Sequence, residues 1–130
     1  NIIIKILKGG NEMVFGFLGF KKDLIKLDHE IERWESPLSY YFKKSGYEGL
    51  DKIVKLSRAL RKKINSTPGA FKRGFVSRSN PKLANSLKIN TEKMVKALEK
   101  FRDQHALIDD PVIIYIQKEV DYFNAINKNI

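Results

Sequence analysis

Apolar side chains recur at steps of three and four residues along most of this chain. The stretches with this spacing are 17–34, 50–64, 83–108 and 112–126. Such spacing places apolar side chains on one face of an α-helix and leaves charged side chains on the other faces. Alternation typical of a β-strand never extends beyond a few residues. The pattern therefore predicts helices along nearly the whole chain.

At three predicted helix starts, proline follows a capping residue. The pairs are Ser36-Pro37, Asn80-Pro81 and Asp110-Pro111. The capping side chain accepts a hydrogen bond from the first free amides of a helix, and proline lacks an amide that would otherwise be unpaired there. We therefore expect a short separate helix at 38–44 and further helices that begin at Pro81 and Pro111.

Glycine and small polar residues mark where helices should end. Gly46 follows the short helix, and an Asn-Ser-Thr-Pro-Gly run at 65–69 follows a predicted helix at 47–65. The segment 70–79 is ambiguous, because its two Phe residues have helical spacing whereas Gly74 weakens a helix. The apolar stripe of the last helix consists of Val112, Ile113, Ile116, Val120, Phe123 and Ile126.

A length of 130 residues suits one domain, and a hydrophobic content of 42% suits a soluble globular core. Isolated amphipathic helices of this length are only marginally stable, so their apolar faces must meet. We predict an all-α fold, a single-domain helical bundle of about four to five helices over residues 13–130. The longest apolar run, 13–20, is too short for a transmembrane helix.

Residues 1–12 are interpreted separately. The sequence Lys-Gly-Gly-Asn-Glu-Met at 8–13 is what translation of a ribosome-binding site ahead of a start codon would give. Under this hypothesis Met13 is the first native residue and 1–12 is a non-native leader. The alternative is a native, flexible, amphipathic N-terminus, and mass spectrometry of the native protein distinguishes the two.

Basic residues are concentrated in about a third of the chain. The formal net charge is +10, from 25 Lys and Arg against 15 Asp and Glu. Residues 52–91 hold eleven of these cations and no Asp or Glu, so the remainder is close to neutral. An unbalanced block costs stability through self-repulsion, and it therefore points to an anionic partner.

Eight residues of this block are the predicted sites of anion or nucleic-acid binding. Lys55, Arg58 and Lys62 have helical spacing and form a ridge opposite the apolar stripe, with no Glu partner to relieve their repulsion. The following loop adds further cations among Gly, Ser and Asn residues, which allow close approach of the backbone to an anion. The full set is Lys55, Arg58, Lys62, Lys63, Lys72, Arg73, Arg78 and Lys82.

Two features of the loop have alternative interpretations. Phe71 and Phe75 lie between basic residues and could stack on nucleic-acid bases, but we expect both rings to pack in the core. The helix that begins at Pro81 could direct its first amides at a phosphate.

No pattern in the sequence predicts catalysis. The absence of Cys excludes disulfides, thiolate ligands and Cys nucleophiles. His105 and Asp109 are four residues apart and could share a metal, but no spaced cluster supplies the other ligands. A glycine-rich phosphate loop and a spaced nucleophile–base pair are also missing. We therefore expect a binding protein without enzymatic activity, metal or cofactor.

The leading functional hypothesis is a nucleic-acid-binding or regulatory accessory protein that contacts phosphates through the eight basic residues. The alternative is an adaptor or immunity-type bundle whose basic face docks on an acidic protein or an anionic membrane surface. A homodimer is a further alternative, in which the Gly- and Phe-rich segment 15–22, with its basic end, pairs between copies. We expect a cytoplasmic location, because Cys is absent and no signal peptide is recognisable.

Overall fold

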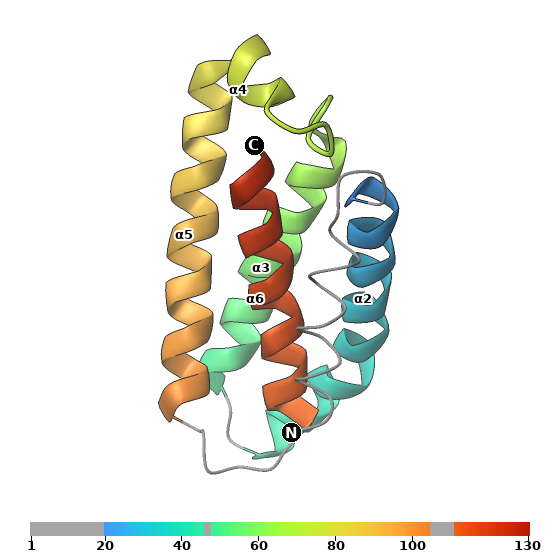
Figure 1. The fold of residues 1–130 in the computed structure, drawn as a ribbon. Helices are drawn as coiled ribbons and strands as arrows, with labels where there is room; N and C mark the ends of the chain where they lie inside the picture. The colour runs from blue at the N-terminus through green and yellow to red at the C-terminus, as the bar shows by residue number, and fades with distance from the viewer. Residues whose placement is uncertain (1–19, 46–47, 105–110) are drawn as a thin grey trace.

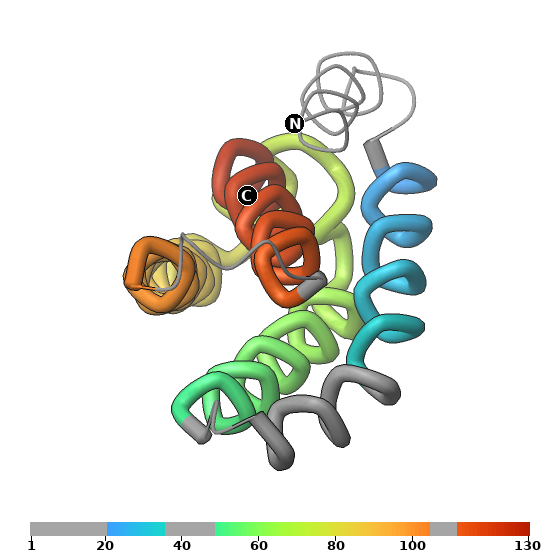
Figure 2. Tube along the Cα trace, turned by 90° about the horizontal axis from the view of Figure 1, so that it is seen from below, coloured from blue at the N-terminus to red at the C-terminus, as the bar shows by residue number. Residues whose placement is uncertain are grey.

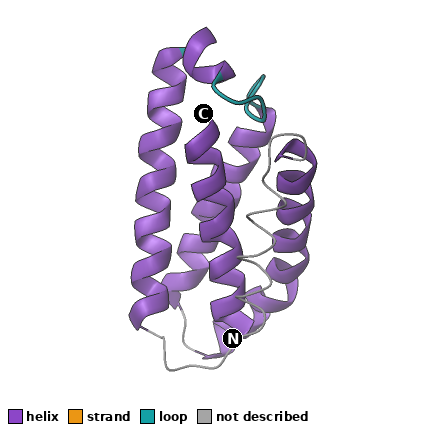
Figure 3. Cartoon of the chain, in the orientation of Figure 1, coloured by secondary structure: helices purple, strands orange, loops and turns teal. Residues whose placement is uncertain are grey.

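The computed structural model describes the backbone of residues 20–45, 48–104 and 111–130, and the side chains of 21–35, 49–104 and 112–130. The described residues form five helices and no strand, which confirms the predicted all-α class (Figure 3). The predictions for 1–12 and for the pair His105 and Asp109 fall outside these residues, and so does most of the segment 15–22, the predicted dimer contact.

Four long helices run alternately in opposite directions (Figure 1). The helices are α2 (Phe20–Ser45), α3 (Glu48–Ser66), α4 (Phe75–Ser79), α5 (Pro81–Gln104) and α6 (Pro111–Asn129). Viewed along the bundle, α6 lies between α5 and α2 and faces α3 across the core (Figure 2). The short helix α4 covers one end, so the molecule is an antiparallel four-helix bundle with a cap.

Among the described side chains, the last helix, α6, has the largest number of buried residues. Its predicted apolar stripe is buried except at Ile113, which is half-buried. A second side of the helix is also buried and carries Tyr115, Glu119 and Tyr122. A helix that is covered on more than one side fits a position enclosed by its neighbours. These polar side chains bring α6 into contact with a charged part of the core.

The predicted helix boundary at Ser36-Pro37 is wrong, and so is the separate helix at 38–44. α2 continues as one helix from Phe20 to Ser45. Proline inside a helix removes one backbone hydrogen bond and crowds the preceding turn, a local cost that packing of the helix can outweigh. The first half of α2 supplies that packing through Leu24, Leu27 and Ile31, all of which are buried.

The predicted limits of the helix at 47–65 and the predicted starts at Pro81 and Pro111 agree with the structure, whereas Gly46 and the end of the stripe at 108 lie outside the described residues. α3 covers the predicted helix at 47–65 to within one residue, and α5 and α6 begin at Pro81 and Pro111. Asn80 caps α5, because its Oδ1 accepts a hydrogen bond from the amide of Leu83 at 3.2 Å.

The connection between α3 and α4 depends on a glycine. Gly69 has a φ of 78°, in the left-handed region that other residues avoid. The ring of Phe75 lies directly against it, so that a Cβ at position 69 would be 1.9 Å from Phe75 Cδ1. Of the ambiguous segment 70–79, only Phe75–Ser79 is helical.

Candidate functional site: the basic surface, a buried charge cluster and a groove

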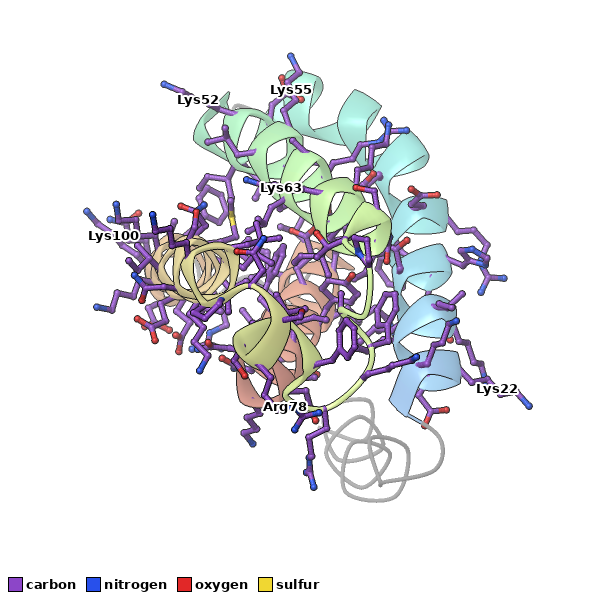
Figure 4. The ribbon with its side chains drawn as sticks, turned by 90° about the horizontal axis from the view of Figure 1, so that it is seen from above. Lys22, Lys52, Lys55, Lys63, Arg78 and Lys100 are labelled. Atoms are coloured by element: carbon purple, nitrogen blue, oxygen red, sulfur yellow. The ribbon has the colours of Figure 1, made fainter. Side chains whose placement is uncertain are left out.

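All eight predicted anion-binding residues are exposed, but they belong to two parts of the molecule. On α3 are Lys55, Arg58, Lys62 and Lys63, and on the segment 72–82 are Lys72, Arg73, Arg78 and Lys82. Lys55 and Arg78 point to opposite sides of the bundle (Figure 4). The eight residues are therefore divided between two parts of the bundle, and on α3 itself Arg58 pairs with Glu35 of α2 whereas Lys63 lines a groove towards α5.

Carboxylates partner two residues of the ridge on α3, so the prediction that the ridge lacks acidic partners is wrong for these two. Lys55 Nζ lies 3.4 Å from Asp51 Oδ2 one turn earlier, just outside the acid-free block. Arg58 Nε lies 3.7 Å from Glu35 Oε2 on α2. Lys55 and Arg58 can still contact an anionic partner, but each carboxylate reduces the net positive charge of the ridge.

The basic loop before α4 has a structural role at the C-terminal end of α6. The amides of Gly74 and Ser77 donate hydrogen bonds to the backbone oxygens of Asn129 and Ile130 at 2.7 and 3.2 Å. Arg73 Nε donates to Asn129 Oδ1 at 3.2 Å. The C-terminal end of a helix carries unpaired carbonyls and a partial negative charge, so amides and cations are favourable there. Part of the positive charge in this loop is thus explained without a ligand.

The two phenylalanines of the loop differ in their environment. Phe71 is half-buried and packs against the core, as expected. Phe75 is 37% exposed and covers Gly69, with Lys72 Nζ 5.5 Å from its ring centroid. The expectation of core packing is therefore confirmed for Phe71 and wrong for Phe75.

Arg61, another cation of the acid-free block, is buried inside the bundle with 1% of its surface exposed. Its Nε donates to Asp28 Oδ1 at 2.8 Å. Its two terminal nitrogens donate to Glu35 on α2 and to Glu119 on α6. We call these four residues the Arg61 cluster. The cluster joins α2, α3 and α6 through charge-assisted hydrogen bonds.

Neutral side chains complete the hydrogen bonds of this cluster. Ser57 donates to Glu119 at 2.7 Å, and the hydroxyl of Tyr115 donates to Glu35 at 3.2 Å. Asn65 donates to Asp28 at 3.0 Å and accepts from the hydroxyl of Tyr122 at 3.3 Å. Within the described side chains every buried nitrogen and oxygen has a hydrogen-bond partner. The buried charges therefore meet the condition under which they are tolerated in a core.

Burial changes the protonation of the cluster. It raises the pKa of Glu119 from its ordinary value of 4.5 to about 7, against the opposing effects of Arg61 and the Ser57 hydroxyl. Burial by itself lowers the pKa of Arg61, but Glu119 and Glu35 outweigh it and the net pKa is raised. Burial also raises the pKa of the Tyr115 hydroxyl. With this raised pKa, Glu119 exchanges a proton near neutral pH.

The sequence carried a signal for the cluster that charge counting missed. Asp28 stands between Leu24 and Ile31 on the apolar stripe of α2, and Glu35 continues the same spacing. Arg61 occupies the corresponding face of α3, four residues after the buried Ser57. Opposite charges at core positions of different helices indicate a buried ion pair.

An open groove of about 410 Å³ lies between α3 and α5. Its apolar lining comprises Leu56, Ala59, Leu60, Met94 and Ala97. Lys63 and Lys93 line it from opposite helices, and no carboxylate belongs to the lining. Leu56 is 55% exposed, the largest value among the exposed large hydrophobic residues of the described chain.

A second hollow, of about 470 Å³, lies between α2 and the loop after α3. His29 and Asp28 both line it, but Asp28 is already engaged by Arg61 and Asn65. In the part of the chain that the structure describes, no group of three His, Cys, Asp or Glu residues could hold a metal.

No protein-family model, curated protein or solved structure matches this chain. Among the helices of the described residues, none combines the length and the apolar character needed to cross a membrane. Conclusions about function therefore rest on the core and surface of the chain itself.

Proposed function

We propose that this chain is a small helical binding module of the adaptor or immunity type, which acts by docking on an acidic protein and not by catalysis. The observation that carries the proposal is the groove between α3 and α5, where an exposed leucine lies among lysines and no carboxylate lines the surface. Apolar surface gathered beside one sign of charge is typical of a protein-interaction site.

The distribution of cations supports a protein partner over a phosphate backbone. Two cations of the ridge are paired with Asp51 and Glu35, and Arg73 is hydrogen-bonded at the end of α6. Nucleic-acid binding relies on many phosphate contacts from one continuous basic surface. The predicted residues occupy two separated parts of the bundle, so one straight nucleic-acid segment would reach only some of them.

Nucleic acid is the second candidate, and one specific observation favours it. Phe75 is partly exposed beside Lys72 at the end of the bundle, and Arg78 and Lys82 follow three and seven residues later in the chain. An exposed aromatic ring among cations is the arrangement that binds unstacked bases. This candidate therefore assigns binding to the segment 72–82 and leaves the groove without a role.

Affinity capture tests the proposed function. The purified chain is immobilised, a nuclease-treated extract is applied, and each retained protein is purified and tested alone for binding. We expect a protein with an acidic surface whose affinity falls as salt is raised. Absence of any partner that binds after purification would contradict the proposal.

Parallel titrations separate the alternatives. Duplex DNA, single-stranded DNA, single-stranded RNA and vesicles with anionic lipid are each added at about 50 mM salt, where phosphate contacts are strong. Saturable nucleic-acid binding with a steep salt dependence, lost in a Phe75→Ala variant, would establish the second candidate in place of the first.

A further inference from the structure

We propose that the groove between α3 and α5 receives a single amphipathic helix of the partner, with a narrow apolar face flanked by Asp and Glu. The inference rests on the proposed function and specifies both the surface and the kind of segment that occupies it. It is derived from the shape, the lining and the charge of this groove.

The shape of the groove suits a helix. It lies between two antiparallel helices, α3 of 19 residues and α5 of 24 residues, and is open to solvent along them. Ala59 of α3 and Ala97 of α5 both line it with small side chains, which leaves room for side chains of an incoming helix. Helix-in-groove recognition uses anchors spaced three and four residues apart, a spacing that follows such a channel.

The lining provides an apolar floor that is incompletely covered. Leu60 is 9% exposed and Met94 is half-buried, so these two residues form the base. Leu56 is 55% exposed at the side of the same channel. Methionine adapts its shape to different partners, and an exposed leucine gains stability when an apolar side chain covers it. A partner would therefore bury surface that water now contacts.

Charge defines the flanks of the occupant. Lys63 and Lys93 line the groove, and Lys52 projects from α3 on the same side of the bundle (Figure 4). The carboxylates of α5 do not line the groove: Glu92 accepts a hydrogen bond from Asn127 of α6, and Glu99 and Asp103 both pair with Arg102. The groove thus complements an acidic helix and repels a basic one.

Another copy of the chain fits this surface poorly. Two copies that met at the groove would place Lys63 and Lys93 of each against the lysines of the other, in a protein of net charge +10. Like charges in contact across an interface cost several kcal/mol, on the order of a thousandfold in affinity. We therefore assign the groove to a different, acidic chain.

Synthetic peptides test this assignment with a defined probe. The test peptide has Leu at i, i+3, i+4 and i+7 and Glu at the flanking positions, and the control peptide has Lys in place of every Glu. A third peptide has the test composition in scrambled order. We expect saturable binding of the test peptide alone, with amide chemical-shift changes confined to residues 56–63 and 90–97 in the full chain.

Substitution of the exposed leucine tests the site. Leu56→Asp should weaken binding of the acidic peptide at least about tenfold, because an apolar contact is lost and a repulsive charge gained. Asn124→Asp, at an exposed position of α6, changes the net charge equally and should leave affinity unchanged within about twofold. Circular dichroism and thermal unfolding establish that both variants are folded.

The outcomes separate this inference from the proposed function. Equal binding of the acidic, basic and scrambled peptides, no saturable binding, or equal effects of Leu56→Asp and Asn124→Asp would each overturn the assignment to the groove. If a captured acidic protein binds Leu56→Asp as well as it binds the unmodified chain, the proposed function stands and the groove does not mediate it. If no acidic protein binds at all, the proposed function itself fails.

Discussion

Arg61 must remain charged inside the bundle, because a guanidinium keeps its proton at any physiological pH. Three carboxylates surround it, so negative charge would be in excess if all of them were ionised. The raised pKa of Glu119 relieves this excess, since burial favours its neutral form. The cluster therefore combines one permanent cation, Arg61, with three carboxyl groups, and protonation of Glu119 lowers their total negative charge.

Removal of the arginine should be severely destabilising. Arg61→Met keeps much of the side-chain volume but leaves the carboxylates of Asp28, Glu35 and Glu119 without their buried cation. Loss of one partner from a buried pair costs about 3–5 kcal/mol, whereas loss of an exposed pair costs about 1 kcal/mol or less. Urea unfolding at neutral pH measures the cost, with Arg58→Met as the control because Arg58 is 54% exposed. Equal losses in the two variants would contradict a structural role for the cluster.

The buried Glu119 predicts a pH dependence of stability with a definite sign. Its pKa is about 7 in the folded chain, against an ordinary value of 4.5. Between these values the folded state binds more protons than the unfolded state, so the free energy of unfolding falls as pH rises. The contribution of this group is complete below the lower value and lost above the higher one, and amounts to at most about 3 kcal/mol.

Glu119→Gln isolates this contribution, because glutamine resembles the neutral acid and does not titrate. The difference in unfolding free energy between the variant and the unmodified chain should shift in favour of the variant from pH 5 to pH 7.5. Urea unfolding at several pH values measures it. A constant difference over this range would show that Glu119 does not exchange its proton there.

Exposure of the eight candidate residues was predictable from sequence, because each stands off the apolar stripes. The burial of Arg61 was not predicted, because a count of charge along the chain ignores which face of the helix each cation occupies. The pairing of Arg58 with Glu35 depends on contact between α3 and α2, which no local pattern encodes. The count of charges thus identified eight exposed cations, but it predicted neither the burial of Arg61 nor the carboxylates that pair with Lys55 and Arg58.

At the level of helices and loops, capping residues and prolines predicted helix boundaries correctly where tertiary packing did not oppose them. Asn80-Pro81 marks a helix start because α4 ends at Ser79 and Asn80 leaves the helical conformation with a φ of −147°, so that its side chain caps a free amide of α5. Ser36-Pro37 carries the same signal within a helix already held by its buried stripe, and there tertiary packing prevails. A start signal in sequence therefore predicts a boundary only if the chain before it can leave the helix.

The turn after α3 predicts a sharp difference between two glycines. Gly69→Ala should destabilise the fold by about 1–3 kcal/mol, because alanine disfavours the positive φ of 78° and its Cβ would collide with the Phe75 ring. Gly49→Ala is the matched control, since a Cβ there meets nothing within 4 Å and position 49 is helical. That variant should be neutral or more stable by up to about 1 kcal/mol. Thermal unfolding compares them, and similar behaviour of the two variants would contradict this account of the turn.

For the molecule as a whole, the excess positive charge is distributed around the bundle and is not focused on one face. The labelled cations Lys22, Lys52, Lys100 and Arg78 project in different directions (Figure 4). Separation of the cations limits the repulsion between any two of them. The net charge of +10 still raises the electrostatic energy of the folded state relative to the expanded, unfolded chain. The groove between α3 and α5 differs from the rest of this surface by the apolar residues that it adds to the charge.

Salt should therefore stabilise this fold, the reverse of what attractive surface pairs would produce. The Debye length falls from about 30 Å at 0.01 M salt to about 8 Å at 0.15 M, which screens repulsion among exposed cations while the buried Arg61 cluster is little affected. We expect the Tm to rise with NaCl over this range. A double variant, Lys62→Glu with Lys82→Glu, lowers the net charge from +10 to +6 at two exposed positions and should show a smaller rise. A Tm that falls with salt, or an equal rise in both proteins, would mean that the surface pairs and not the net charge dominate the electrostatic energy.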